Sequence, residues 1–441
     1  MSEQELRARV ANQRCLVVGA SVSGRAAARV LGTLGAEVVL ADDAPARRRE
    51  LAAEAVEVLP LDDVARQAFA LVVVSPGVRP ERVRALELKG EVIGELELGY
   101  LLASAPITAI TGTNGKSTVT TLTAAMLGEG ALAAGNLGTP LSEVAREPVR
   151  RFVVEASSFQ LLWSERFHAE VAGVLNLTPN HLDYHGSFDA YRAAKARLVE
   201  RLAPGDVLVV PAHDDAVAAI PVPHGVEVRT FAVHGDADYW LSDGVLLGPG
   251  GRVLCHVDEL ARPWEHEIAN VLAAWALAEA SGGTLASARV AALAFRGLPH
   301  RLQVVLRDRE GVLWVDDSKA TTPEATLAAL GVAERVVLLA GGRTKGTDFR
   351  ALRAGAARLR GVVAIGEAAA AVEADLADVV PWLERAGSME EAVRLAAERA
   401  EPGDVVLLAP GATSWDWYRD YAERGDDFAR WVRALREGGE R

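Results

Sequence analysis

Lysine is scarce in this 441-residue chain, because only five of its 47 basic residues are lysines and the rest are arginines. Lys116, Lys195, Lys319 and Lys345 lie in the strings TGTNGKST, YRAAKARL, DDSKAT and GGRTKGTDF, and Lys89 stands apart. An ammonium group is a compact point charge for a phosphate, and it can lose its proton to become an amine, which a guanidinium cannot easily do. The pattern therefore indicates four positions where phosphate binding or amine chemistry takes place.

The string around Lys116 is typical of a phosphate-binding loop. It follows an apolar segment and precedes a helical pattern, so glycines and a helix N-terminus can bring backbone N–H groups to phosphate oxygens. Lys116 would reach the terminal phosphates, and Ser117 could ligate Mg²⁺. The outer glycine of the usual pattern is replaced by Ile110, so the loop is a variant. Its candidate nucleotide-binding residues are Gly112, Thr113, Asn114, Gly115, Lys116, Ser117 and Thr118.

A second group of candidate residues runs from Glu155 to Lys195. Glu155 ends an apolar segment, where a carboxylate beside a phosphate loop is well placed as a further Mg²⁺ ligand. His181 follows another apolar segment, in NLTPNHLD, and we expect it at a Mg²⁺–nucleotide site, with a purely structural histidine as the alternative. His185 stands four residues later, which would permit a zinc pair, but no cysteine or HExxH motif accompanies it. We expect His185 on the surface.

Two weaker motifs point to other classes of protein. The string GASVSG (19–24) follows an apolar segment, and Asp42 and Asp43 end the next one, which favours a dinucleotide- or UDP-binding fold. A serine replaces the middle glycine, so the string alone is a weak signal for an NAD site. The string from His266 to Asn270 begins like HExxH but ends in asparagine, so we expect no zinc protease.

Polar motifs also gather in the last third of the chain. LPHR, DDSKAT, GGRTK and TS, which begin at residues 298, 316, 341 and 413, lie in loops or at the ends of apolar segments. Ligands of open α/β sheets bind at the carboxyl ends of the strands. Together these motifs present several cations and hydroxyl groups, which suit a phosphate and a carboxylate.

Short continuous apolar runs alternate with alanine-rich helical segments, which indicates buried parallel strands and an α/β fold. The alternation forms three successive blocks, so we expect three domains, at 1–104, 105–296 and 297–441. The strings PGDVLVV and PGDVVLL are similar, so we expect the same kind of turn, followed by a strand, at both places. The predicted strands are 15–18, 38–41, 71–74, 107–110, 152–154, 171–175, 207–210, 336–339, 362–365 and 405–409.

Bulk composition narrows the classes of protein. The net charge of −13 argues against nucleic-acid binding, which needs a basic surface. Cys15 and Cys255 lie in apolar runs, which indicates a reducing compartment and no disulfide framework. The N-terminal segment is charged, so we expect no signal peptide, and the apolar runs are too short to span a bilayer. We expect a cytoplasmic monomer that binds neither nucleic acid nor membranes.

Taken in order, TGTNGKST, EASSFQL, NLTPNHLD, YRAAK, GLPHR and DDSKAT resemble the motifs of the Mur ligase family over nearly the whole chain. The resemblance implies a Rossmann-like N-terminal domain that binds UDP, a central P-loop ATPase domain with a mostly parallel sheet, and a Rossmann-like C-terminal domain for the amino acid. The early SPG (75–77), the short first domain and the ending SWDWYRDYAERGDDF look like the D-glutamate-adding member. The implied activity is ATP-dependent ligation of D-glutamate to UDP-N-acetylmuramoyl-L-alanine through an acyl phosphate, in peptidoglycan precursor synthesis.

The resemblance also implies a role for each matching residue. Lys116 would hold the β- and γ-phosphates of ATP, Ser117 and Glu155 would ligate one Mg²⁺, and His181 would ligate a second. Lys195 would react with CO₂ to form a carbamate that helps to hold the metal, which requires a primary amine. The other implied contacts are Asn270 with adenine; Arg301 and Asp317 with the nucleotide; Lys319 with the transferring phosphate or D-glutamate; Ser21, Val22, Asp42, Asp43, Ser75, Gly77, Asn136 and His181 with the UDP-sugar; and Thr321, Lys345, Ser414 and Tyr421 with D-glutamate.

One departure from the family pattern and three alternative functions stay open. Family members often carry His-Asn-x-x-Asn near the adenine, whereas Glu267 replaces the first asparagine here, which puts one adenine contact in doubt. The nearest alternative is another Mur ligase, or a folylpolyglutamate synthase-like ligase, with a different amino-acid acceptor. A nicotinamide-dependent oxidoreductase would leave the Lys116 loop unexplained. A non-catalytic nucleotide-sugar sensor would not need two metal sites.

Overall fold

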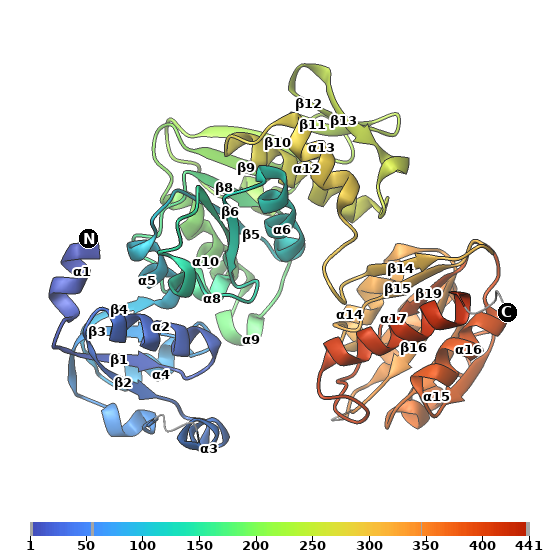
Figure 1. Cartoon of the computed structure of the whole chain (residues 1–441), viewed down its shortest axis with the longest axis horizontal. Helices are drawn as coiled ribbons and strands as arrows, with labels where there is room; N and C mark the ends of the chain where they lie inside the picture. Colours follow the sequence, from blue (N-terminus) through green and yellow to red (C-terminus); the bar gives the residue numbers. More distant parts are fainter. Residues whose placement is uncertain (1–2, 54–56, 345, 438–441) are drawn as a thin grey trace. The chain divides into compact units, whose positions relative to one another are not determined.

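The computed structural model describes residues 3–53, 57–344 and 346–437. The chain divides into two compact units, Met1–Phe295 (unit 1) and Arg296–Arg441 (unit 2). Unit 1 holds two sheets and unit 2 holds one (Figure 1). All three sheets are wholly or mostly parallel and carry helices between their strands, so the predicted α/β fold class is confirmed. The predicted boundary at 104/105, between the two sheets of unit 1, stays a prediction.

The first sheet of unit 1 is fully parallel, in the order β2-β1-β3-β4. Alternate residues of β1 and β3 join two different hydrophobic clusters, because side chains of a strand alternate between faces and both faces here are covered. Its strands are β1 Arg14–Val18, β2 Glu37–Ala41, β3 Ala68–Val74 and β4 Lys89–Gly94. Its helices are α1 Glu3–Val10, α2 Val22–Thr33, α3 Pro45–Ala53, α4 Pro80–Ala85, α5 Glu95–Leu102 and the 3₁₀ helix η1 Leu61–Val64.

The second sheet has the order β13-β12-β11-β10-β9-β8-β5-β7-β6 and is parallel from β6 to β11. Strands β11, β12 and β13 are joined as antiparallel pairs. The strands are β5 Ile107–Thr111, β6 Ala131–Gly135, β7 Arg151–Glu155, β8 Val171–Val174, β9 Val207–Pro211, β10 Glu227–Ala232, β11 Tyr239–Ser242, β12 Val245–Gly248 and β13 Arg252–His256. The helices are α6 Lys116–Leu127, α7 Leu141–Val144, α8 Ser158–Leu162, α9 Leu182–His185, α10 Phe188–Glu200, α11 Asp215–Ala218, α12 Glu265–Ala280 and α13 Leu285–Ala294, with η2 Pro249–Gly251 and η3 Val257–Glu259.

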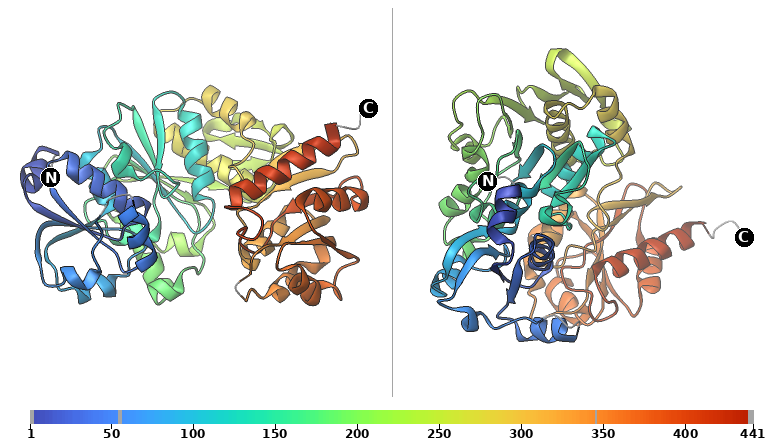
Figure 2. Two further views of the ribbon diagram at one scale, coloured as in Figure 1. Left: turned by 60° about the horizontal axis from the view of Figure 1, so that its bottom comes forward. Right: turned by 60° about the vertical axis from the view of Figure 1, so that its left-hand side comes forward.

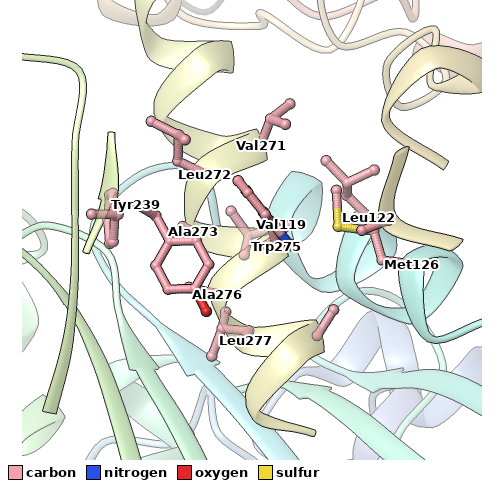
Figure 3. Close-up of a cluster of buried hydrophobic side chains, with 14 of the residues drawn as sticks. Val119, Leu122, Met126, Tyr239, Val271, Leu272, Ala273, Trp275, Ala276 and Leu277 are labelled. Carbon is pink, nitrogen blue, oxygen red and sulfur yellow. The ribbon is translucent and has the colours of Figure 1, made fainter. Parts of the chain in front are cut away.

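Helix α12 is apolar on almost every side, and its sequence of alanines and leucines has high helix propensity. It packs beside α6 against the second sheet, with Val119, Leu122 and Met126 of α6 in the same cluster (Figure 3). The ring of Trp275 meets Tyr239 of β11 edge-on, with 5.0 Å between ring centroids. This core fixes α6, the helix that follows the phosphate loop.

The sheet of unit 2 has the order β14-β15-β19-β16-β17-β18, in which only β14 is antiparallel. Helices α16 and α17 lie side by side on one face (Figures 1 and 2). The strands are β14 Gln303–Arg307, β15 Leu313–Asp316, β16 Val336–Gly341, β17 Leu359–Ile365, β18 Leu383–Ala386 and β19 Val405–Leu408. The helices are α14 Pro323–Ala329, α15 Ala369–Leu376, α16 Met389–Arg399, α17 Tyr421–Glu437, η4 Leu330–Val332 and η5 Phe349–Arg358.

All ten predicted strands lie in strands of the structure, although residues 175 and 409 fall just outside β8 and β19. Cys15 and Cys255 are buried free thiols. None of the described helices is long and apolar enough to cross a membrane.

Candidate functional site

The phosphate loop connects β5 to α6, and β5 lies between β8 and β7 in the parallel part of the second sheet. Gly112 and Gly115 have φ angles of 153° and 81°, which favour glycine. The chain after β8 fixes the loop: Thr113 N–H donates to the Asn176 carbonyl (3.0 Å), and Asn114 N–H donates to the Asn176 side-chain oxygen (2.9 Å). The loop is therefore shaped by protein contacts before any ligand binds.

Two ammonium groups converge on one carbonyl of this loop. Lys116 Nζ donates to the carbonyls of Gly112 (3.0 Å) and Thr113 (2.9 Å), and Lys195 Nζ, from α10, also donates to Gly112 (2.7 Å). Lys195 is 1% exposed. Burial, and after it the charge of Lys116, lowers the pKa of the Lys195 amine well below its ordinary value, while Glu155 opposes this. A lowered pKa favours the neutral amine, the form that can react with CO₂.

Glu155 supplies a carboxylate beside the loop, because β7, which it ends, is paired with β5. Its Oε1 accepts a hydrogen bond from Asn136 Nδ2 (2.7 Å). Its buried Oε2 has no hydrogen-bond partner among the described residues. A buried carboxylate oxygen without a donor is costly unless a cation completes it. Ser117, buried in the first turn of α6, presents a hydroxyl next to the loop.

His181 follows β8, and its electrostatic neighbours are Lys116, Asp183 and Lys195. Burial, and after it the charge of Lys116, lowers the pKa of His181, which favours the neutral imidazole that binds metals. No three His, Cys, Asp or Glu side chains are grouped to hold a metal ion in the part of the chain that the structure describes. Mg²⁺ needs only one or two protein ligands, since waters and phosphate oxygens supply the rest. Ser117, Glu155 and His181 therefore fit Mg²⁺ bound together with a nucleotide.

The prediction that His185 lies on the surface is wrong. Its Nε2 lies 3.0 Å from Ser158 Oγ, and its ring stacks on Phe159 with 5.5 Å between centroids. Tyr184 and Tyr191 meet the same imidazole edge-on, at 5.1 and 5.4 Å. His185 is therefore a half-buried member of an aromatic cluster that also contacts His181 through Phe159, and is not free to form a zinc pair.

Helix α12 brings Asn270 to the phosphate loop. Asn270 Oδ1 lies 2.5 Å from the place that a Cβ on Gly115 would take. One turn earlier, the carboxylate of Glu267 lies 2.9 Å from the guanidinium of Arg262, and both side chains are buried. Glu267, which replaces the asparagine of the family pattern, therefore introduces a buried negative charge. The guanidinium of Arg262 beside it supplies the opposite charge that a buried carboxylate requires.

Gly115→Ala is expected to weaken ATP binding by at least about tenfold, because the new methyl group must displace Asn270 and the positive φ becomes strained at a cost of about 1–3 kcal/mol. Calorimetric titration with ATP measures the change. Gly128→Ala is the matched control at the other end of α6: its φ of 74° carries the same kind of strain, but a Cβ there meets nothing within 4 Å. Equal ATP affinities of the two variants would contradict the expectation.

A cavity of about 490 Å³ lies over the carboxyl ends of the first sheet. Five predicted residues line it, and so do three arginines. Burial would raise the pKa of Asp42, but hydrogen bonds from Ala20 N–H and Ala44 N–H and the guanidinium of Arg47 outweigh it and lower the pKa. Asp43 is held bidentately by Arg82 at 2.7 and 2.9 Å. The lining includes Gly19, Ser21, Asp42, Asp43, Ser75, Gly77, Val78, Arg47, Arg79 and Arg82.

The GASVSG motif shapes the floor of this cavity. A Cβ on Gly24 would lie 1.8 Å from the Gly19 carbonyl, so α2 can start this close to β1 only with glycine. Ser75 Oγ donates to the same carbonyl at 2.8 Å. Val22, predicted as a contact, is 53% exposed at the start of α2 and does not appear among the lining residues.

In unit 2 the polar motifs meet because β15, β19 and β16 are neighbours in the sheet. The loops that follow these strands are joined by backbone hydrogen bonds, from Gly411 N–H to Ala320 O (2.8 Å) and from Arg343 N–H to Thr413 O (2.7 Å). DDSKAT, GGRT and PGATS therefore form one continuous edge. Lys345 lies outside the described residues.

Several predicted acceptor-site residues lie along this edge. Lys319 Nζ is 5.1 Å from the centre of the Tyr421 ring, a cation–π contact, and Ser318 Oγ donates to the Tyr421 carbonyl (2.7 Å). Ser414 is buried, and Thr321 is half-buried. The edge thus combines an exposed ammonium with hydroxyl groups, which suits a carboxylate ligand.

Arg301 lies between two residues with positive φ, His300 (58°) and Leu302 (45°), so its loop is strained and needs support. Leu302 N–H donates to Asp317 Oδ1 (3.1 Å), and Lys319 N–H donates to the His300 carbonyl (3.1 Å). The positions of Arg301 and Lys319 are thereby linked through one loop.

His300→Gln should make unfolding depend differently on pH. The hydrogen bond to Asp316 (Nδ1 to Oδ2, 2.7 Å), against the effect of burial, raises the pKa of His300. Its stabilisation is therefore complete below the unfolded pKa of about 6.5 and is lost as pH rises through the folded value. We expect the variant to lose about 1.5–3 kcal/mol of unfolding free energy at about pH 5.5 and less at about pH 9, measured by urea unfolding. The exposed His224→Gln is the control, and a pH-independent loss would contradict the expectation.

Comparison with known proteins identifies the class that this fold and site define. The model of the Mur ligase middle domain matches residues 110–278, and that of the Mur ligase glutamate ligase domain matches residues 300–412. The chain belongs to the Mur ligase family. It is 40% identical over 449 residues to the UDP-N-acetylmuramoylalanine--D-glutamate ligase of Pelotomaculum thermopropionicum, covering 97% of this chain and 98% of that one. The enzyme of the same name from Streptococcus mutans is 38% identical, covering 96% and 98%.

Solved structures share the fold at lower identity. The UDP-N-acetylmuramate-alanine ligase MurC of Thermotoga maritima aligns with a TM-score of 0.58 and 19% identity, covering 96% of this chain and all of that chain. The MurF ligase of the same organism, in complex with ADP, aligns with a TM-score of 0.53 and 17% identity, covering 86% and 97%.

Two residues that support the phosphate loop escaped sequence reasoning. Tyr191 Oη lies 3.0 Å from Thr113 Oγ1, and its ring lies under Lys195 Nζ at 4.9 Å. Asn176 pairs with the backbone of Asn114. Tyr191 and Lys195 are four residues apart in YRAAK and share a helix face, which was a usable signal for Tyr191.

Proposed function

We propose that this protein joins D-glutamate to UDP-N-acetylmuramoyl-L-alanine, with ATP converted to ADP and phosphate, in peptidoglycan precursor synthesis. It is an ATP-dependent ligase of the Mur family. The observation that carries the proposal is the convergence of Lys116, Lys195, Glu155 and His181 on one phosphate loop. The relatives named as D-glutamate ligases, alike over nearly their full length, support the choice of acceptor. We expect the enzyme to act as a monomer in the cytoplasm.

The first step is phosphoryl transfer. A carboxylate oxygen of the UDP-sugar attacks the γ-phosphorus of ATP, and the bond from that phosphorus to the bridging oxygen breaks. The products of this step are an acyl phosphate and ADP. Both reactants are anionic, so the step depends on positive charge near the transferring group. Lys116 would bind the β- and γ-phosphates, and Lys319 would bind the transferring phosphoryl group or the acceptor.

The second step forms the amide. The neutral amine of D-glutamate attacks the acyl carbon, phosphate leaves, and the nitrogen loses a proton to solvent or a nearby base. This step needs positioning more than charge. Thr321, Ser414, Tyr421 and Lys345 are proposed to hold the two carboxylates of D-glutamate, with Arg301, Asp317 and Asn270 on the nucleotide.

Ser117 and Glu155 are proposed to hold one Mg²⁺, and His181 with a carbamate of Lys195 a second. The ions would neutralise charge on the phosphates during transfer. The carbamate forms when the neutral Lys195 amine attacks CO₂, making a C–N bond and releasing one proton. The unpartnered Glu155 Oε2 and the lowered pKa values of His181 and Lys195 support this assignment.

The 490 Å³ cavity is proposed to bind the UDP end of the sugar nucleotide. Its arginines are suited to a diphosphate, and the Asp42 and Asp43 loop to the polar edge of a base. Asn136, hydrogen-bonded to Glu155, would contact the same substrate nearer the phosphate loop.

The test is phosphate release from ATP with Mg²⁺ and UDP-N-acetylmuramoyl-L-alanine, using D-glutamate, L-glutamate, L-lysine, meso-diaminopimelate and D-Ala-D-Ala in parallel. Release that depends on D-glutamate alone is the expected result. Phosphate release with another acceptor would support the ligase activity but contradict the D-glutamate specificity, and would indicate another Mur or folylpolyglutamate synthase-like enzyme. Release with none of them would contradict the proposed reaction.

A further inference from the structure

Helix α9, which follows His181, is fastened to a loop of the first sheet. Tyr184 Oη donates to the carbonyl of Val78 at 3.0 Å, with the Pro76 carbonyl at 3.4 Å. Asp183 adds an exposed ion pair with Arg79 at 3.6 Å. Because the acceptors are backbone carbonyls, the hydrogen bond reports the position of the loop and not of one side chain.

The same loop is a wall of the 490 Å³ cavity. Ser75, Gly77, Val78 and Arg79 all line it, and Ser75 Oγ fastens the start of the loop to the carbonyl of Gly19. A ligand that fills the cavity would therefore lie against the segment that accepts the hydrogen bond from Tyr184.

At its other end, α9 holds His181 in a strained conformation. His181 has a φ of 51°, a left-handed value that is unfavourable for a residue with a side chain. Its carbonyl accepts hydrogen bonds from Tyr184 N–H (3.1 Å) and His185 N–H (3.0 Å). The ring of Phe159 contacts both Tyr184 (4.4 Å between centroids) and His181 (4.8 Å). Displacement of Tyr184 would therefore release the constraint on His181.

We propose that Tyr184 is a positioning residue that couples the occupancy of the nucleotide-sugar cavity to the placement of His181 at the phosphate loop. The inference rests on the proposed function, which assigns the cavity to UDP-N-acetylmuramoyl-L-alanine and His181 to the Mg²⁺–nucleotide. Binding at either site orders the Tyr184 contact and so lowers the cost of binding at the other. Such coupling is reciprocal, since each ligand must change the affinity of the other by the same factor.

Calorimetry tests the coupling with the full chain. The affinity for UDP-N-acetylmuramoyl-L-alanine is measured without nucleotide and with saturating Mg²⁺ and a non-hydrolysable ATP analogue. In the wild type the nucleotide should tighten binding by about fivefold or more. In Tyr184→Phe, which keeps the contact with Phe159, this factor should fall close to one, while the affinity for the UDP-sugar alone changes by less than about threefold. Asp183→Asn, which removes the exposed ion pair with Arg79 and a negative charge near His181, should give an intermediate factor.

Tyr100→Phe is the matched control. Tyr100 is a half-buried tyrosine of unit 1 that packs on Phe167, away from the cavity and the phosphate loop, and its variant should keep the wild-type factor. A wild-type factor in Tyr184→Phe, or no coupling in the wild type, would overturn the proposal. A wild type that fails to bind the UDP-sugar at all would instead overturn the proposed function, and that result needs no variant. Thermal unfolding of each variant shows whether it is folded.

Discussion

Lys195→Ala is expected to lose about three orders of magnitude in kcat, because the carbamate of Lys195 would help to hold a metal ion that neutralises the transferring phosphate. Added formate or acetate should raise the kcat of the variant by about tenfold or more. Recovery is expected because a free carboxylate can occupy the space of the missing carbamate. It is expected to be partial because the free ion lacks the effective concentration of a tethered group. The measurement is steady-state phosphate release with a series of short carboxylates.

The Lys195 contacts allow a competing explanation that the same experiment separates. Lys195 Nζ donates to the Gly112 carbonyl at 2.7 Å. If Lys195 only supports the loop through this hydrogen bond, no carboxylate will restore activity. Lys195→Arg should also be inactive, because a guanidinium cannot form the carbamate. Lys89→Ala, an exposed lysine outside the motifs, is the control. Full activity of Lys195→Ala would end the carbamate hypothesis.

Lys116→Ala is expected to reduce kcat by about 10³-fold or more, because it removes the only ammonium of the phosphate loop itself and leaves the charge on the γ-phosphate less well neutralised in the transition state. The ATP dissociation constant should rise much less, since the backbone N–H groups of the loop still bind phosphate. Single-turnover phosphate release together with ATP calorimetry separates the two effects.

Short carboxylates should not restore Lys116→Ala, which distinguishes it from Lys195→Ala. The variant should also make Lys195 harder to carbamylate, because the charge of Lys116 is the second cause, after burial, of the lowered pKa of that amine. Loss of ATP affinity by the same factor as kcat would contradict the assignment of Lys116 to the transition state.

Local sequence patterns predicted the strands that are buried on both faces of their sheets. Strands β1, β3, β5 and β16 are mostly apolar and mostly buried because helices cover both faces of their sheets. The repeated PGDV strings do form the same turn, with positive φ at Gly205 and Gly403 before β9 and β19. Strand β6, with the sequence ALAAG, was missed because its alanines equally suit a helix, and it becomes a strand by pairing with β7.

The site divides in the same way between local and distant determinants. The phosphate loop is a contiguous string whose strand and helix neighbours could be read directly, so its residues were predictable. The stacking of His185 on Phe159 and the contact of Tyr184 with Val78 join segments 26 or more residues apart. Nothing in the short string HLDYH specifies that its tyrosine meets a carbonyl of the loop after β3, because tertiary packing decides this contact.

The scarcity of lysine makes this enzyme open to chemical footprinting. Lys89 and Lys319 are exposed, Lys116 is half-buried beside the phosphate loop, and Lys195 is almost inaccessible. An amine-acylating reagent therefore has few targets to modify, and each can be resolved by mass spectrometry. The acylation rate of Lys89 should be the same with and without ligand. It therefore serves as an internal reference for the decrease in the acylation rate of Lys116 when nucleotide binds.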